Sequence, residues 1–216
     1  MKHKISPILV CSLFSLASCM QAEKVSLDTS GAEGLLLSGL SIELGLFGGS
    51  GGGSCSNCLM FAATTSHNGD FSPFPAGADT LCMSDPKYPG SGTFRAMLVD
   101  GVNRIATTVG PSSSAGQYNW VFKPNTNYYY IDALNTIQPV FTSNSAGLSM
   151  TVPPFGNFGS STYWFWSGMN ADWTVATSNC TQWTTTAGNG TYALGGSGGA
   201  YTYSCSSAVP FLCIEQ

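Results

Sequence analysis

The chain has 216 residues, of which 43% are hydrophobic, 12% are aromatic and only 8% are charged. Seven basic residues stand against eleven acidic ones, and the formal net charge at pH 7 is −4. This length and apolar content suit a single buried core, and the acidic balance argues against nucleic acid or heparin-like polyanions as partners, because these need a basic stripe.

The N-terminus has the pattern of an export signal. Two lysines precede an uncharged apolar run from Ile5 to Ala17, which is too short for a membrane span of about 20 residues. The run ends in Leu16-Ala17-Ser18-Cys19, which resembles the lipobox of bacterial lipoproteins, where the cysteine takes a lipid and the chain is cut before it. We therefore expect residues 1–18 to be a signal peptide and Cys19 to carry a lipid that anchors the chain to a membrane. An ordinary signal peptide cut near Ala22 is the alternative.

Residues 19–54 are expected to form the lipidated N-terminus and a tether. The run Gly48–Ser54 contains only Gly and Ser, a composition that behaves as flexible coil, and a coil of this length would span roughly 30–35 Å. Ile42, Leu44 and Leu46 alternate with other residues, so a short docking strand in this segment stays open.

Six cysteines remain after Cys11 leaves with the signal peptide and Cys19 takes the lipid. An even number in an exported chain suggests disulfides, although fifteen pairings are possible. A zinc site at the first pair would need two further ligands, and a thioredoxin-like motif would need a βαβ setting, so a small structural disulfide is the simpler interpretation there. The six are Cys55, Cys58, Cys82, Cys180, Cys205 and Cys213.

The chain from residue 55 onward is rich in Thr, Ser, Tyr, Trp, Gly and Asn, which favours strands and turns. A first strand is expected over Met60–Thr65, and Asn68-Gly69 is expected to turn the chain after it. A helix is expected over Ala76–Met83, because three of its apolar side chains fall on one helical face at i, i+3 and i+4. Pro86 and Pro89 then prevent much further helix.

The middle of the chain predicts a hairpin. The segments Thr93–Val99 and Val102–Thr107 flank Asp100-Gly101, a sequence typical of two-residue hairpin turns. The region between Pro111 and Phe158 has little periodicity and is expected to form long loops. Further short strands are expected over Tyr118–Phe122, Pro139–Thr142, Ser161–Trp166 and Phe211–Ile214.

The C-terminal part carries an ordered set of aromatic and cysteine residues: Tyr163 to Asn170, then Trp173, Cys180, Trp183, Cys205, and Phe211-Leu212-Cys213-Ile214-Glu215. This order resembles the end of the C-type lectin-like fold, and it is closest to the endostatin-type branch. Gly77-Ala78-Asp79 with Cys82, and Gly92-Thr93-Phe94-Arg95-Ala96, extend the resemblance towards the N-terminus.

At closer range the chain is similar to the DUF1554 family of domains, which is abundant in lipoproteins of Leptospira. The resemblance covers about residues 55–216 and implies an α+β domain of C-type lectin-like fold, with short antiparallel strands, one or two helices and long loops. The residues that carry it are Met60-Phe61, Asn68-Gly69, Ala76-Gly77-Ala78-Asp79 with Cys82, Gly92 to Arg104, Trp120-Val121 with Pro124-Asn125-Thr126, Gly168 with Asn170 and Asp172-Trp173, Ser178-Asn179-Cys180, and Leu212 to Gln216.

The resemblance also implies a disulfide pairing. In the lectin-like fold the cysteine of the first helix is bonded to the last strand, and the two intervening cysteines are bonded to each other. Here this implies Cys82–Cys213 and Cys180–Cys205, which leaves Cys55–Cys58.

Calcium-dependent sugar binding is not expected. Lectin-like domains of that kind carry Glu-Pro-Asn or Gln-Pro-Asp and a Trp-Asn-Asp before the third bridge cysteine, whereas Ala200-Tyr201-Thr202-Tyr203-Ser204 precedes Cys205 here. We expect no metal and no cofactor.

An enzymatic site is not expected either. Two Gly-x-Ser-x-Gly matches, at residues 48–52 and 195–199, lack the strand–turn–helix setting of a nucleophile elbow. His67 is expected in a turn. Asp100, Asp132 and Asp172 show no sign of converging as an acid–base pair.

Four residues are candidates for ligand contact. Trp173 and Trp183 lie in loop-like sequence, and exposed aromatic residues are common anchors in interfaces. Asn170 and Asp172 are neighbours of Trp173. Trp166, by contrast, is expected in the core.

These observations predict a binding module displayed on the surface of a bacterial outer membrane by its lipid. The predicted partner is a host extracellular-matrix protein or a glycan, bound without calcium. The alternative is a structural cell-envelope lipoprotein with a periplasmic or outer-membrane partner.

Overall fold

The computed structural model describes residues 55–132, 134–150, 164–194 and 200–216. The expected signal peptide, the Cys19 lipid site and the tether over residues 19–54 lie outside the described residues. In the described part of the chain, no helix is long and apolar enough to cross a membrane.

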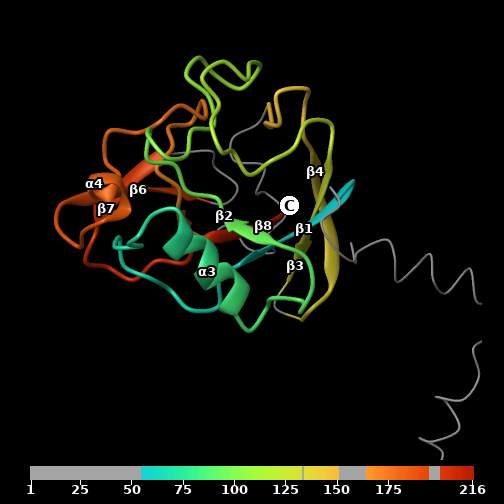
Figure 1. Ribbon diagram of the computed structural model, residues 1–216, viewed down its shortest axis with the longest axis horizontal. Coiled ribbons are helices and arrows are strands. Elements are labelled where there is room, and N and C mark those ends of the chain that lie inside the picture. The colour runs from blue at the N-terminus through green and yellow to red at the C-terminus, as the bar shows by residue number, and fades with distance from the viewer. Residues whose placement is uncertain (1–54, 133, 151–163, 195–199) are drawn as a thin grey trace, which may run out of the picture. The chain divides into compact units, whose positions relative to one another are not determined.

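A five-stranded sheet forms the centre of the domain (Figure 1), in the order β2-β8-β1-β3-β4. The strand β8 is antiparallel to both of its neighbours, β1 is parallel to β3, and β3 and β4 form an antiparallel pair. The strands are β1 (Asn57–Ala62), β2 (Phe94–Ala96), β3 (Asn127–Ile131), β4 (Ile137–Thr142) and β8 (Leu212–Glu215).

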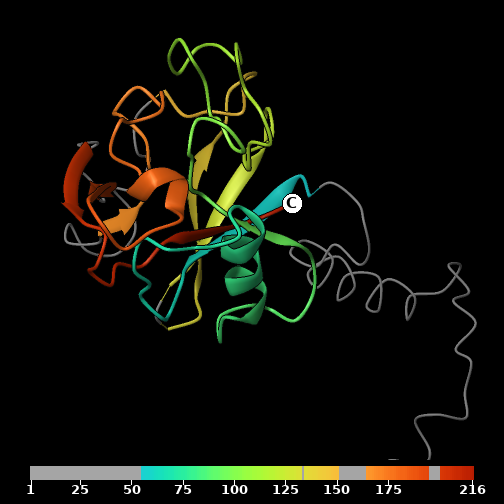
Figure 2. The ribbon, with the colours of Figure 1, turned by 60° about the vertical axis from the view of Figure 1, so that its left-hand side comes forward.

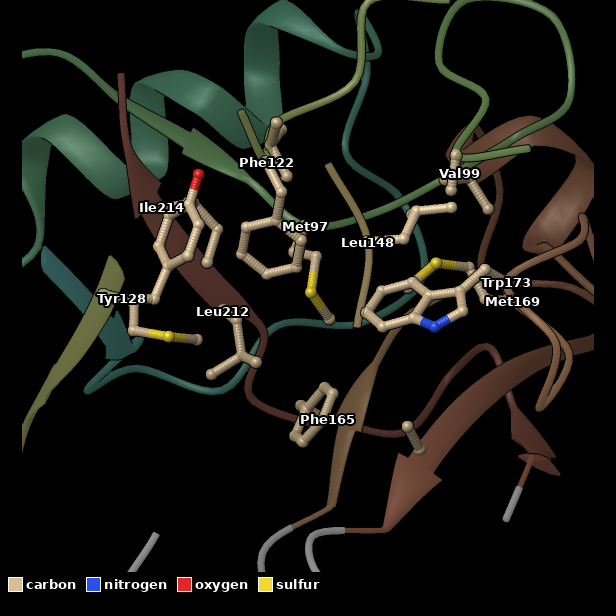
Figure 3. Close-up of a cluster of buried hydrophobic side chains, with 14 of the residues drawn as sticks. Met97, Val99, Phe122, Tyr128, Leu148, Phe165, Met169, Trp173, Leu212 and Ile214 are labelled. Carbon is tan, nitrogen blue, oxygen red and sulfur yellow. The ribbon is translucent and has the colours of Figure 1, made fainter. Parts of the chain in front are cut away.

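The central strands bury side chains on both faces of this sheet. Successive side chains of a strand point to opposite faces, so Met60 of β1 enters one hydrophobic cluster and Phe61 enters the other. The strand β8 alternates in the same way, with Ile214 in the first cluster and Cys213 in the second. Figure 3 shows the first cluster, into which side chains from loops also reach.

A second, three-stranded antiparallel sheet has the order β5-β6-β7. Its strands are β5 (Trp164–Trp166), β6 (Asn189–Leu194) and β7 (Ala200–Ser204). One face of it supplies Phe165 and Ala193 to the first hydrophobic cluster. In Figure 1, β6 and β7 lie at one side of the domain and β4 lies at the opposite side.

In the part of the chain that the structure describes, two helices complete the mixed α+β architecture (Figure 2). The helix α3 (Ala76–Ser84) packs beside β2 and buries Ala78 and Cys82, as the periodicity of the sequence predicted. The second, α4 (Cys180–Trp183), is a single turn, and all four of its residues have positive φ. The coarse fold class is therefore confirmed.

The predicted hairpin around Asp100-Gly101 is wrong. Only Phe94–Ala96 of its first arm is a strand, and Val102–Thr107 forms none. The carboxylate of Asp100 instead accepts hydrogen bonds from the backbone N–H groups of Val102, Asn103 and Arg104, at 2.8–3.0 Å. Asp favours such local turns because its side chain competes with strand pairing for backbone donors.

Other boundaries also differ from expectation. The first strand starts at Asn57 and ends at Ala62. The segment 118–122 is not a strand, and Tyr118 forms only an isolated bridge to Ile105. The expected long-loop region contains β3, which was not predicted. The strand predicted over Pro139–Thr142 is confirmed as part of β4, which starts two residues earlier. Of the strand predicted over residues 161–166, the first three residues lie outside the described part.

Three disulfides tie these elements together, and they are the pairings that the resemblance implied. Cys82–Cys213 joins α3 to β8, Cys180–Cys205 joins α4 to the residue that follows β7, and Cys55–Cys58 closes a short loop that ends at the second residue of β1. In the chain-entropy model, sequence separations of 131, 25 and 3 correspond to about 5, 3.5 and 1.6 kcal/mol of stabilisation.

We expect the Cys82→Ala, Cys213→Ala double variant to lose about 5 kcal/mol of unfolding free energy, because the longest closed loop is opened. The matched control is Cys55→Ala with Cys58→Ala, which should lose only about 1.6 kcal/mol by the same model. Chemical denaturation of the two oxidised proteins measures both values. Equal losses in the two variants would show that loop length does not govern the effect.

An ion pair between a buried arginine and an aspartate whose side chain is 23% exposed joins α3 to the chain that follows β2. Arg104 is fully buried, and its two Nη atoms donate to the two carboxylate oxygens of Asp79 at 3.1 and 2.8 Å. The guanidinium also donates to the carbonyl oxygens of Ala96 and Asn119. Asp79 in turn accepts the backbone N–H of Ala96 at 2.8 Å, so every polar atom of the pair has a partner.

Arg104→Met should lower the unfolding free energy by about 3 kcal/mol, the low end of the range for a buried pair, because the Asp79 carboxylate that loses its cation is partly exposed. Adding Asp79→Asn should recover part of this loss, since asparagine keeps an acceptor for Ala96 N–H and carries no charge. A double-mutant cycle by urea denaturation measures the coupling. Simple additivity of the two single changes would contradict the assigned role of the pair.

Candidate functional site

Asn170 and Asp172 lie on an exposed turn that their own side chains close. The amide of Asn170 donates to Thr174 Oγ1 at 3.0 Å and to the carbonyl oxygen of Val175 at 3.1 Å. Asp172 accepts from the backbone N–H and the hydroxyl of Thr174. The hydrogen bond from that hydroxyl lowers the pKa of Asp172. These contacts give both residues a role in shaping the turn.

The expectation that Trp173 and Trp183 are exposed ligand contacts is wrong, because both are fully buried. Trp173 lies inside the first hydrophobic cluster (Figure 3) and its indole N–H donates to the carbonyl oxygen of Ser149 at 2.9 Å. Trp183 lies in the second cluster and donates to the carbonyl oxygen of Val99 at 2.8 Å. Irregular backbone around a tryptophan does not keep it in water when the ring can be buried and its N–H satisfied.

The aromatic side chains that remain exposed lie on the three-stranded sheet. We call Trp164, Tyr192, Tyr201 and Tyr203 the aromatic patch. Trp164 is 37% exposed, Tyr201 44% and Tyr203 40%, while Tyr192 is half-buried. The Tyr192 ring lies 5.4 Å from that of Trp164, 5.6 Å from Tyr201 and 6.2 Å from Tyr203, and Trp164 and Tyr203 are 5.1 Å apart.

Strand register explains why these rings meet. Tyr201 of β7 is directly opposite Tyr192 of β6, and cross-strand neighbours share one face of a sheet. Tyr203 is opposite Gly190, where a side chain would collide with Cys180 Sγ and the Trp166 ring. On the same face, Trp166 lies 5.6 Å from the Trp183 ring and is fully buried, whereas Trp164, two residues earlier, is not.

The face that carries the patch has no charge. None of the residues of β5, β6 and β7 is acidic or basic. Thr, Ser and Asn supply the polar groups of these strands. Such a surface can offer aromatic ring faces, tyrosine hydroxyls and neutral hydrogen-bonding groups to a ligand, and it has no group in these strands to pair with a ligand's charge.

A small pocket of about 150 Å³ lies between the end of β1 and the end of α3. Two of its polar residues are already engaged: Asp85 accepts the backbone N–H and the hydroxyl of Thr64, and His67 Nδ1 lies 2.9 Å from the carbonyl oxygen of Asn68. No nucleophile and base meet among the residues that line it, which are Ala63, Thr65, His67, Leu81, Ser84, Asp85, Pro86 and Phe211.

The other titratable groups considered from the sequence also have structural partners. Asp100 and Asp132 each accept backbone N–H groups of the turn that follows them. Glu215 is buried, accepts the N–H of Leu59 at 2.8 Å, and its pKa is raised by burial. Within the described ranges, no three His, Cys, Asp or Glu side chains gather as they would around a metal ion. Both Gly-x-Ser-x-Gly matches fall outside those ranges.

Over residues 64–202 the sequence matches the family described as Protein of unknown function (DUF1554). The chain belongs to this family. A comparison with curated proteins gives no match. The DUF1554 span includes Trp164, Tyr192 and Tyr201 of the aromatic patch and ends one residue before Tyr203.

Sequence reasoning missed the patch, although one signal for it was present. Tyr201-x-Tyr203 alternates with a period of two, which is typical of a strand with one aromatic face. The Gly-rich run before these tyrosines favoured a loop over a strand. The rings that they meet, Tyr192 and Trp164, are brought beside them only by the pairing of β6 with β7 and with β5.

Proposed function

We propose that this chain is a binding module that a lipid on Cys19 displays on the surface of a leptospiral outer membrane. Its domain is of C-type lectin-like fold, and it contacts a host extracellular-matrix protein or a glycan without calcium, through the aromatic patch. Support comes from the lipobox-like Leu16-Ala17-Ser18-Cys19, from the mixed α+β fold stapled by three disulfides, and from membership of the DUF1554 family.

The observation that carries the proposal is the exposure of three large rings side by side on one sheet face. Burying aromatic area against a partner is favourable, and aromatic residues are enriched among the residues that dominate binding energy. The rings of the patch already pack against one another, so their rotamers lose less freedom on binding than isolated side chains would.

The chemistry of the patch suits both partner classes. The apolar C–H face of a sugar ring can stack on tyrosine or tryptophan, and the hydroxyls of Tyr201 and Tyr203 can bond to sugar hydroxyls. A protein partner would use the same rings as a hydrophobic contact with a polar rim. Neither contact needs a cation, since no charge has to be neutralised in β5–β7.

Trp164→Ala should weaken ligand binding about 30-fold, which corresponds to the roughly 2 kcal/mol typical of a central aromatic contact. The protein to test is the full chain carrying Cys19→Ser, presented to a panel of matrix proteins and to a glycan array. Tyr118→Ala is the matched control, because Tyr118 is 60% exposed but lies outside the patch. The proposal is contradicted if Tyr118→Ala and Trp164→Ala reduce binding equally. It is also contradicted if the folded wild type shows no saturable binding.

Surface display is tested separately on intact cells. A protease added outside should digest the domain before the outer membrane is permeabilised, because a lipid-anchored module on the outer leaflet is accessible. Immunoblotting measures the loss, with a periplasmic protein as the control. A domain that is digested only after permeabilisation would instead support a structural envelope protein that faces the periplasm.

A further inference from the structure

The strand β7 is an edge strand, and within the described residues none of the usual features protects it against pairing. It ends the three-stranded sheet, and in the described part of the chain no strand pairs with its outer side. All five of its residues are exposed. Natural sheets protect such edges with lysine, proline, a bulge or a covering element, and Ala200-Tyr201-Thr202-Tyr203-Ser204 contains neither proline nor charge.

The other edges of the two sheets are protected. The edge strand β2 is three residues long, and Asp79 of α3 accepts the backbone N–H of its Ala96. The edge strand β4 contains Pro139, and its pairing with β3 shifts register. The strand β5 is three residues long, and its Trp166 N–H donates to the carbonyl oxygen of Pro210. This contrast singles out β7 as the edge that is left open for a partner strand.

Backbone geometry shows which groups β7 presents at its outer side. Thr202 is opposite Thr191 of β6. The N–H of Thr191 donates to the carbonyl oxygen of Ser178, and its own carbonyl accepts from Ser167 and Gly168, so these groups point away from β7. In an antiparallel ladder such a pair is not hydrogen-bonded, and the N–H and C=O of Thr202 therefore point outward. By the same alternation, those of Ala200 and the N–H of Ser204 also point outward, whereas the Ser204 carbonyl already accepts the N–H of Ser207 at 3.0 Å.

The sequence of β7 is close to symmetric about Thr202. Read in either direction, a threonine is flanked by two tyrosines and then by a small residue. Around a two-fold axis through Thr202, an antiparallel pair of these strands places Thr202 opposite Thr202 of the second copy and Tyr201 opposite Tyr203 of the second copy. Threonine pairs and aromatic pairs are both favourable across strands, and no like charges meet.

We propose that two copies of this chain pair through β7 and form one continuous six-stranded sheet. The contact is isologous, so it closes as a dimer, and strand addition at an open edge supplies main-chain hydrogen bonds. The dimer goes beyond the proposed binding function and does not depend on it. Its consequence is that two aromatic patches lie on one sheet, which raises the avidity for a repeated ligand.

Sedimentation equilibrium of the full chain carrying Cys19→Ser, over a series of concentrations, tests the proposal. The expected result is a dimer that dissociates on dilution. Thr202→Pro removes an outward N–H that β6 does not use, a position where an edge strand tolerates proline, and it should yield monomer throughout. Thr202→Lys places two like charges opposite each other and should weaken the dimer about tenfold or more. Thr202→Val is the control, because it keeps the backbone donor and a β-branched side chain.

Amide hydrogen exchange locates the contact. The N–H of Thr202 should exchange more slowly as the wild-type concentration rises, and circular dichroism should show that every variant is folded. Wild type that is monomeric at all concentrations overturns the proposal, as does a dimer that Thr202→Pro and Thr202→Lys leave intact. Trp164→Ala should leave the dimer unchanged, so a failure of dimerisation and a failure of ligand binding are distinguishable.

Discussion

The buried guanidinium of Arg104 is the interaction on which the arrangement of the core depends. It bonds to Asp79 of α3, to the backbone of β2 at Ala96 and to the carbonyl oxygen of Asn119. A cation in the interior is costly unless it is fully paired and hydrogen-bonded. These three segments must therefore meet at one point, and the helix is held beside the edge of the central sheet. The Cys82–Cys213 disulfide reinforces the same junction one helical turn later, by joining α3 to β8.

Once that junction is in place, the two hydrophobic clusters decide which aromatic residues reach solvent. Trp173 comes from a loop and Trp183 from the single turn α4. The clusters on the two faces of the sheet enclose both rings, and backbone carbonyls accept their indole N–H groups. Trp164 lies in a regular strand and stays partly exposed, because the cover that Trp183 provides for Trp166 does not extend to it. Exposure here follows from what packs above a residue rather than from its secondary structure.

The three-stranded sheet carries both the aromatic patch proposed to bind a ligand and the edge strand proposed to form a dimer. One of its faces supports the core through Phe165 and Ala193, and the opposite face carries the aromatic patch. Its outer strand β7 turns backbone groups of Thr202 outward, at an edge that no strand in the described part of the chain covers. A dimer through β7 would leave the patch on the same face of a wider sheet. In these proposals ligand contact uses the side chains of β7, whereas self-association uses its outward backbone groups and also pairs Tyr201 with Tyr203 of the second copy.

The sequence by itself determined the features that depend on local spacing or on motif order. The periodicity of Ala78, Leu81 and Cys82 located the helix, Phe211 to Ile214 located the closing strand within one residue, and the ordered motifs identified the family. Tertiary structure alone decided the features that depend on distant partners: the Asp100 turn in place of a hairpin, the strand β3, the burial of Trp173 and Trp183, and the aromatic patch. The physical reason is that burial and strand pairing depend on contacts between segments far apart in the chain. A local sequence pattern does not predict which distant segment will pack over a given side chain.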